Sequence, residues 1–217
     1  VNAITGIADA LPMSGGFSGT GGQLRLVQPG TTPVVHDLIG YGSSATSEIS
    51  PATAPAGGKS SKRILNDDEL PIDSGNNAQD FLAACGEPTP GQADTGYIPR
   101  VSGCEQPPVI TPPATDPEPT TPETTPVTQP EEPGQSAGAP TYLPLVITEI
   151  LANPASPQQD STDEFIELYN PNDSAVNLQD YRLQTGSDYR YSYTLGDTLL
   201  GPHEYLAITS AVSKLSL

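Results

Sequence analysis

Residues 146–154 (VITEILANP) and 163–171 (DEFIELYNP) decide the fold of this chain. Each joins a short run rich in aliphatic and aromatic residues to a closing Asn-Pro, and Asn-Pro is turn chemistry between strands. Further along, the three tyrosines of residues 189–194 (YRYSYT) alternate with polar residues, which is typical of a strand with one buried face. Short strands separated by such turns predict an all-β sandwich.

The composition favours the same class and excludes several partners. The 217 residues include 25 Pro and 21 Gly, and 35% are hydrophobic, so a single large core is not expected. The formal net charge is -18, and no segment is basic. Because phosphates are bound mainly through Lys and Arg, we expect no nucleic-acid partner and no attraction to an acidic membrane surface. No stretch is long and apolar enough to predict direct membrane insertion.

A low-complexity segment separates two patterned ones. Residues 105–140 consist almost wholly of Pro, Thr, acidic and small residues. Such a segment cannot bury a core, its prolines favour polyproline II, and its like charges repel. We therefore predict a disordered, semi-rigid linker between residues 1–104 and residues 141–217.

The two ends of the chain carry a repeat. Residues 3–13 (AITGIADALPM) align without gaps on residues 207–217 (AITSAVSKLSL), which predicts a tandem array whose period is one domain plus one linker. Residues 1–104 are then the C-terminal portion of a first domain, and residues 141–217 are the N-terminal portion of a second. Both natural ends, including any signal peptide, are expected outside the fragment. Since half a sandwich exposes strand edges, we expect the halves to pack as one circularly permuted sandwich.

Residues 146–154, 163–171 and 176–183 together resemble the opening strands of the lamin tail domain (LTD) family, and residues 201–208 are similar to its following strand. The upstream segment is similar to the closing pattern of bacterial members, in the stretches 21–26, 34–42, 61–63, 76–81 and 88–91. The residues that carry the motif are Asp37, Tyr41, Gly42, Arg63, Asn77, Asp80, Phe81, Glu149, Asn153, Pro154, Glu164, Phe165, Ile166, Glu167, Leu168, Tyr169, Asn170, Leu178 and Leu183.

The resemblance implies an immunoglobulin-like β-sandwich present as two incomplete tandem copies of the bacterial extracellular type. It does not imply an enzyme. Bacterial members look like accessory modules of exported or surface proteins, whereas nuclear lamins use theirs for chromatin and protein contacts. The acidity of this chain and its Pro/Thr-rich segment favour the bacterial role.

Two cysteines, Cys85 and Cys104, flank a Gly/Pro-rich loop. A disulfide between them would suit an exported protein and would stabilise it by about 3 kcal/mol in the chain-entropy model. Two unrelated thiols are the alternative. A metal site is not expected, since two cysteines without a nearby histidine lack the usual four ligands.

The carboxylates Asp163, Glu164 and Glu167 form the best candidate for acid/base catalysis. On an extended strand, however, Glu164 and Glu167 point to opposite faces. We interpret them as strand-edge charges that form local hydrogen bonds and discourage edge pairing. We predict no catalytic residue.

Acidic loops offer two candidate sets of calcium ligands. One set is Asp67, Asp68 and Glu69 with Asp73, and the other is Asp160 with Asp163. Neither has the EF-hand spacing, so solvated loops are the default interpretation and calcium is the open alternative. No other cofactor is expected.

Two further patterns have a structural and a functional interpretation. The tyrosines of residues 189–194 are typical of a core or cross-strand ladder, although aromatic faces also stack on sugars. Residues 14–22 (SGGFSGTGG) are predicted to form a flexible hairpin loop, because they lack the Gly-Lys-Ser/Thr ending of a phosphate-binding loop. His36 and His203 lie far apart in the sequence, and no serine occupies a nucleophile-elbow motif.

These observations predict a non-catalytic, extracellular or cell-surface structural or binding module that attaches to a protein or a glycan. The alternative is an accessory domain of an exported hydrolase or nuclease whose catalytic domain lies outside this fragment. Nucleic-acid binding, the third class, conflicts with the charge.

Overall fold

The computed structural model describes residues 17–66, 68, 70–83, 88–91, 142–159 and 163–209. The predicted linker and both cysteines lie outside these residues, so the linker and the disulfide stay predictions. The described residues 17–91 and 143–209 belong to one compact unit. Two segments far apart in the sequence therefore build one body.

The first sheet contains strands from both segments. Its strands, in spatial order, are β2 (Val34–Gly42), β1 (Gly21–Gln28), β8 (Arg182–Thr185) and β9 (Tyr191–Thr194). All neighbours are antiparallel, with Leu24 opposite Ile39 and Leu26 opposite Leu183. The pairing of β1 with β8 thus joins the upstream segment to the downstream one.

The second sheet is shared in the same way. Its strands, in spatial order, are β11 (Tyr205–Thr209), β6 (Phe165–Tyr169), β5 (Val146–Leu151), β3 (Ser61–Arg63) and β4 (Phe81–Ala83). All its pairs are antiparallel, and β3 of the upstream segment pairs with β5 of the downstream segment, with Ser61 opposite Ile150. A small ribbon of β7 (Val176–Asn177) and β10 (Leu199–Leu200) completes the strands that the structure describes.

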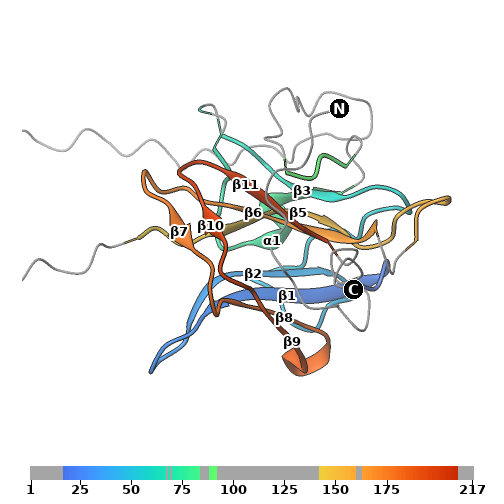
Figure 1. Cartoon of the computed structure of the whole chain (residues 1–217). Helices are drawn as coiled ribbons and strands as arrows, with labels where there is room; N and C mark the ends of the chain where they lie inside the picture. Colours follow the sequence, from blue (N-terminus) through green and yellow to red (C-terminus); the bar gives the residue numbers. More distant parts are fainter. Residues whose placement is uncertain are drawn as a thin grey trace, which may run out of the picture. The chain divides into compact units, whose positions relative to one another are not determined.

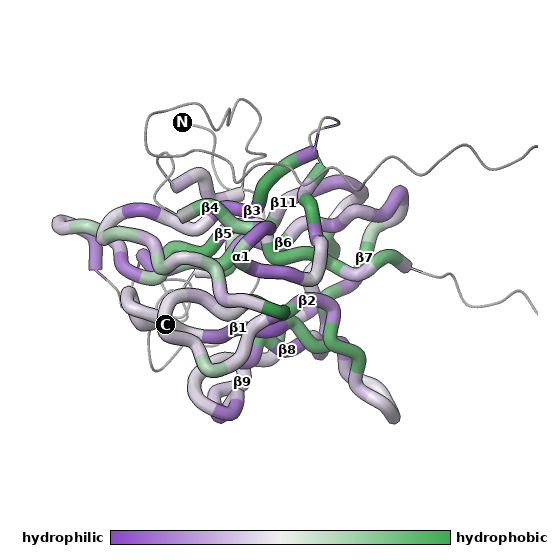
Figure 2. Tube along the Cα trace, turned by 180° about the vertical axis from the view of Figure 1, so that it is seen from behind, coloured by the Kyte–Doolittle hydropathy of each residue, from purple (hydrophilic) through white to green (hydrophobic). Residues whose placement is uncertain are grey.

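The two sheets form separate layers (Figure 1). One hydrophobic cluster contains buried residues of both, for example Leu24 and Ile39 from the first sheet and Ile147 and Ile166 from the second. Hydrophobic residues recur on strands of both sheets (Figure 2), and every residue of β5 and β6 is buried. The predicted immunoglobulin-like β-sandwich is therefore confirmed.

Two short helical turns connect strands of the sandwich. The single turn α1 (Asn77–Asp80) leads directly into β4. The 3-10 turn η1 (Ser187–Tyr189) connects β8 to β9. Among the described residues, no helix has the length and apolar character needed to cross a bilayer.

The structure corrects two boundaries of the predicted pattern. Tyr189 lies in η1 and not in a strand, because the chain turns there through positive φ angles at Gly186, Asp188 and Tyr189. Of the predicted glycine-rich loop, residues 14–16 lie outside the described residues, whereas the last two glycines already belong to β1. The pairing of β1 with β2 extends through these glycines despite their low strand propensity.

Candidate functional site

Arg63 is the centre of a buried polar network between the two sheets. Its side chain is fully buried, and its Nη2 lies 2.5 Å from Asp37 Oδ2. Nε donates to the carbonyl oxygen of Ile147 at 2.7 Å, and Nη1 donates to that of Ile72 at 2.9 Å. The guanidinium also lies over the Phe81 ring, 4.5 Å from its centroid. One side chain thus connects β3 with β2, β5 and the loop before α1.

Asp37 in β2 is the partner that compensates this buried charge. Its Oδ2 also accepts the backbone N–H of Ile147 at 2.7 Å, whereas Oδ1 has no hydrogen-bond partner among the described residues. Burial raises the pKa of Asp37, against the opposing effects of the Arg63 charge and the Ile147 hydrogen bond. One oxygen of a buried carboxylate is therefore left unsatisfied.

Two motif residues in α1 hold the neighbouring loops. Asp80 accepts hydrogen bonds from the Ser74 backbone N–H at 3.1 Å and the Ser74 hydroxyl at 2.5 Å, and its Oδ2 lies 3.7 Å from Arg63 Nη1. Asn77 Oδ1 accepts the backbone N–H groups of Gly40 at 2.8 Å and Glu48 at 3.0 Å. The turn therefore fixes the loop after β2 against the rest of the network.

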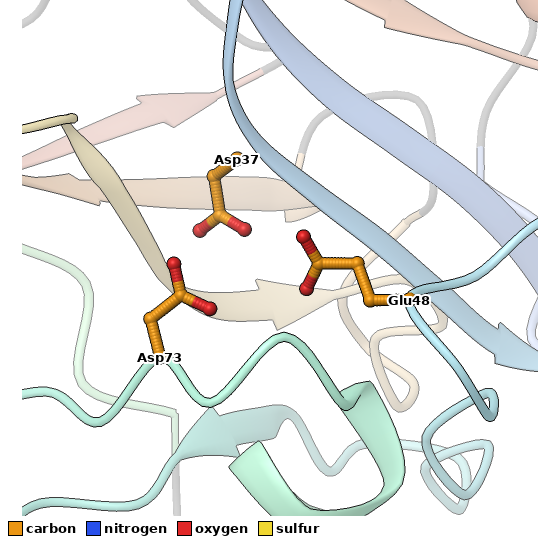
Figure 3. A group of neighbouring side chains, drawn as sticks. All are labelled: Asp37, Glu48 and Asp73. Carbon is orange, nitrogen blue, oxygen red and sulfur yellow. The ribbon is translucent and has the colours of Figure 1, made fainter.

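Three carboxylates meet beside this network. Oxygens of Asp37, Glu48 and Asp73 all lie within 4.8 Å of one another, and Figure 3 shows the three side chains pointing toward a common space. Burial raises the pKa of Glu48 to about 7, and the negative charges of Asp37, Asp73 and Asp80 add to this effect while Arg63 opposes it. We call these three residues the acidic cluster.

A second pair of motif carboxylates lies in the five-stranded sheet. Glu149 accepts the Thr89 backbone N–H at 3.2 Å, and its Oε1 lies 3.7 Å from the Nζ of buried Lys62. Glu167 accepts the Thr148 hydroxyl at 2.6 Å and the Gly91 backbone N–H at 2.7 Å. Both carboxylates are fully buried and hold residues 88–91.

Two further motif residues satisfy buried backbone groups at the ends of β6. Glu164 accepts the backbone N–H of Phe17 with both carboxylate oxygens at 3.1 Å. Asn170 donates through Nδ2 to the carbonyl oxygens of Leu200 at 3.1 Å and Gly201 at 2.8 Å. Since buried polar groups cost free energy unless they are paired, these contacts account for polar residues at buried positions.

The remaining motif residues have structural positions as well. Gly42 has a φ of +58°, a conformation that glycine adopts readily, and the hydroxyl of buried Tyr41 donates to the Ser18 carbonyl oxygen at 2.9 Å. The carbonyl oxygen of Asn153, before Pro154, accepts the Gly58 backbone N–H at 2.7 Å. The buried apolar members of the motif are Phe81, Phe165, Ile166, Leu168, Tyr169, Leu178 and Leu183.

The candidate catalytic carboxylates do not converge on one site. Glu164 and Glu167 bind backbone groups of different upstream segments, and Asp163 accepts the Gln159 backbone N–H at 2.8 Å. The interpretation of Glu164 and Glu167 as strand-edge charges with local hydrogen bonds is wrong. β6 is an interior strand between β11 and β5, and the partners are remote in the sequence.

The two candidate sets of calcium ligands are only partly described. Asp67, Glu69 and Asp160 lie outside the described residues, and Asp68 is exposed. Asp73 instead approaches Asp37 and Glu48. Sequence reasoning missed Glu48, because it lies in a loop without strand periodicity or a ligand motif.

A pocket of about 500 Å³ lies beside the start of β1. One wall is the loop after β2, with Ser43, Ser44 and Thr46, and another is the turn between β8 and β9, with Asp188 and Arg190. Hydroxyl groups, one acidic group and one guanidinium thus face the same space. This arrangement offers donors and acceptors to a small polar ligand.

Aromatic residues and glycines define the shape of this pocket. Tyr41 and Tyr191 contribute to the lining, and Arg190 lies over the Tyr191 ring, 4.9 Å from its centroid. A Cβ at Gly22 would approach the Tyr41 hydroxyl to 2.8 Å, and one at Gly186 would approach Tyr191 Cδ2 to 2.6 Å. The absence of side chains at these two positions therefore leaves room for the rings.

Comparison with known proteins adds one match. Residues 139–215 match the family model of the Lamin Tail Domain, so this segment is similar to that family. Neither a curated protein nor a solved structure matches the chain. The family is a non-enzymatic, immunoglobulin-like fold family, in agreement with the sandwich described above.

Proposed function

With residues 139–215 similar to the lamin tail domain, we propose that this chain is a non-catalytic module that binds a glycan at a cell surface or in the extracellular space. The pocket beside β1 is the observation that carries this proposal. It brings hydroxyl groups, a carboxylate and a guanidinium together with the half-buried ring of Tyr191 in a volume of about 500 Å³.

The chemistry of the lining suits a sugar. A pyranose presents hydroxyl groups around its edge and apolar C–H faces that stack on aromatic rings. The pocket offers hydroxyl groups for the edge, from Ser43, Ser44 and Ser187, and the ring of half-buried Tyr191 for the face. Its volume lies within the range of about 300–1,000 Å³ that is usual for small-molecule sites.

The walls of the pocket are held in place by contacts that do not need a ligand. Gln23 Nε2 donates to the Gly186 carbonyl oxygen at 3.1 Å, and Thr185 Oγ1 donates to the Gln23 carbonyl oxygen at 2.8 Å. In the facing loop, Ser44 Oγ donates to the Thr46 carbonyl oxygen at 2.6 Å. Because little has to be ordered on binding, the entropic cost of capturing a ligand is low.

The extracellular setting rests on sequence composition. A net charge of -18 and a Pro/Thr-rich segment between the two halves suit a module displayed on a stalk, and they disfavour nucleic acid as the partner. The accessory role beside an exported hydrolase or nuclease stays the alternative prediction. Translation of the flanking DNA distinguishes the two, since a neighbouring catalytic domain supports the accessory role.

Titration of the ¹⁵N-labelled full chain with a panel of neutral oligosaccharides tests the proposal. We expect at least one to shift the amide resonances of residues 43–46 and 186–191 in a saturable way. Asp188→Asn and Arg190→Gln should each weaken this binding at least tenfold, since both side chains are exposed in the pocket.

Arg182→Gln is the matched control, because Arg182 is exposed on β8 and does not line this pocket. It should bind as the wild type does. The glycan proposal fails if no oligosaccharide perturbs these resonances at millimolar concentration, or if the shifts map to another face of the sandwich.

A further inference from the structure

We propose that Asp37, Glu48 and Asp73, the acidic cluster, form a binding site for a divalent cation, with Ca²⁺ as the preferred ion. The three ligands come from β2, from the loop after β2 and from the loop before α1. Asp73 belongs to one of the two calcium sets that the sequence suggests. Asp37 and Glu48 belong to neither. The acidic cluster and the pocket have no residue in common.

The distances between the ligand atoms fit a calcium ion. One oxygen from each of the three side chains lies within 4.8 Å of the other two. Calcium binds oxygen at about 2.3–2.6 Å, so two oxygens on opposite sides of one ion lie roughly 4.6–5.2 Å apart, and adjacent ones lie closer. The three carboxylates point toward one another in Figure 3, and the spacing of their oxygens falls within this limit.

An unsatisfied oxygen points to a ligand independently of the charge cluster. Asp37 is 2% exposed, and its Oδ1 has no hydrogen-bond partner among the described residues. Its other oxygen, Oδ2, already accepts from Arg63 Nη2 and the Ile147 backbone N–H. A buried carboxylate oxygen without a partner is costly, and a bound cation would remove that cost.

The balance of charge also favours a cation. The acidic cluster and Asp80 surround Arg63, whose Nη1 lies 3.5 Å from Asp73 and 3.7 Å from Asp80. One guanidinium cannot neutralise four carboxylates, so excess negative charge remains beside a buried site. Asp80 is already occupied by hydrogen bonds from Ser74 and Asn76, which leaves the other three to bind the ion.

The ligands are positioned before an ion arrives. Asp37 is held by Arg63 and Ile147, and Glu48 Oε2 accepts Asn77 Nδ2 at 2.9 Å. The Asp73 side chain is 36% exposed and leaves an entrance for a hydrated ion. Calcium takes six to eight oxygens, so water molecules at this open side complete its coordination shell.

The kind of ligand selects the kind of metal. The cluster offers only carboxylate oxygens, which are hard ligands that suit Ca²⁺ and Mg²⁺. Magnesium requires near-octahedral geometry at about 2.0–2.1 Å, whereas calcium tolerates irregular arrangements and longer bonds. Three carboxylates from one strand and two loops form an irregular set of ligands, which favours calcium.

Isothermal titration calorimetry of the full chain, after treatment with chelator and dialysis, tests the site with CaCl₂ and with MgCl₂. We expect saturable binding of one calcium ion, with a dissociation constant on the order of 10⁻⁴ to 10⁻³ M as in extracellular modules, and weaker binding of magnesium. Saturating calcium should also raise Tm, because the ion binds the folded state.

Asp73→Asn and Glu48→Gln should each weaken calcium binding at least tenfold. Neither residue is fully buried, so both variants should keep a dispersed amide spectrum in chelator. Asp68→Asn is the matched control, because Asp68 is an exposed carboxylate that lies outside the cluster. It should bind calcium as the wild type does.

Two results would overturn the proposal. One is the absence of saturable calcium binding at millimolar concentration. The other is binding to Asp73→Asn and Glu48→Gln that is as tight as binding to the wild type. The alternative is a proton that is shared between the carboxylates and forms a hydrogen bond with Asp37 Oδ1. In that case Glu48→Gln will raise Tm in chelator, and calcium will leave the wild-type Tm unchanged.

Discussion

Arg63 shows how much of this fold depends on one side chain. Its three nitrogen atoms bind Asp37, Ile147 and Ile72, which belong to β2, to β5 and to the loop before α1. Each of these groups is buried or half-buried, so none can turn to water if the guanidinium is lost. The Arg63 guanidinium therefore satisfies the buried polar groups that lie where the two sheets pack together.

Replacing this charge should be severe. Arg63→Met keeps much of the side-chain volume but leaves the Asp37 carboxylate buried without its ion pair, and breaking a buried pair in this way costs about 3–5 kcal/mol. The free energy of unfolding in urea measures the loss. Arg182→Met, at an exposed position, should lie within about 0.5 kcal/mol of the wild type. A similarly small effect at Arg63 would contradict its central role.

His36 makes stability depend on pH. Its Nδ1 accepts the backbone N–H of Leu145 at 2.8 Å, which requires that nitrogen to be unprotonated, and burial lowers the pKa of the ring from its ordinary value of 6.5. The unfolded state then binds more protons than the folded state at mildly acidic pH. The stabilising contribution is complete above pH 6.5 and is lost as the pH falls below that value toward the folded-state pKa.

Urea unfolding in chelator at several pH values between about 5 and 8 measures this dependence. His36→Asn keeps an acceptor near the Leu145 amide but does not titrate in this range. As the pH falls, the unfolding free energy of the wild type should therefore decrease relative to that of His36→Asn. A difference that does not change with pH would exclude His36 as the source.

At the scale of elements, buried glutamates hold a short segment against the five-stranded sheet. Glu149 accepts the Thr89 backbone N–H, and Glu167 accepts the Gly91 backbone N–H. Residues 88–91 belong to no strand, so these two contacts take the place of sheet pairing. Carboxylates are suited to this role because they accept several hydrogen bonds and donate none.

Glu167→Gln tests the contact at Gly91 separately from the contact at Thr89. The amide has one acceptor oxygen for the Thr148 hydroxyl and the Gly91 N–H, which the carboxylate accepts on separate oxygens. We expect hydrogen exchange at Gly91 to accelerate by about tenfold, which corresponds to about 1.4 kcal/mol, close to the lower end of the range for a hydrogen bond to a charged group. Exchange at Thr89, held by Glu149, serves as the internal control and should change much less.

Sequence reasoning predicted which residues form strands better than it predicted where each strand lies in its sheet. The short apolar runs of residues 146–151 and 165–169, each followed by Asn-Pro, identified β5 and β6, because apolar runs and turn chemistry are local properties of the chain. The assignment of β6 to a sheet edge was wrong, since position in a sheet depends on which remote strands pair. Tyr189 was misplaced for a similar reason, because positive φ angles in the preceding turn interrupt the alternation.

At the scale of the whole molecule, the two segments form shared sheets. β1 pairs with β8 and β3 pairs with β5, so in each sheet the upstream strands join the downstream strands at one pairing. The hydrophobic cluster also draws on both segments. Either segment alone would expose strand edges and much of its apolar face.

Cleavage of the predicted linker tests this dependence directly. With a protease site placed at residue 120, we expect the two fragments to co-elute on size exclusion and to keep dispersed amide resonances, since the sheet pairing does not require covalent connection. In denaturant they should separate. Fragments that separate without denaturant would show that the segments do not form a stable common core.

The sequence by itself determined the all-β class and the strand candidates that end at Asn-Pro, because strand periodicity and turn chemistry are local properties. Only the tertiary structure decided that Asp37, Glu48 and Asp73 meet, and that residues 43–46 face residues 186–191 across a pocket. Both arrangements depend on pairing and packing between residues remote along the chain. Such contacts leave no periodic signal in a single sequence, since many pairings satisfy the same local preferences.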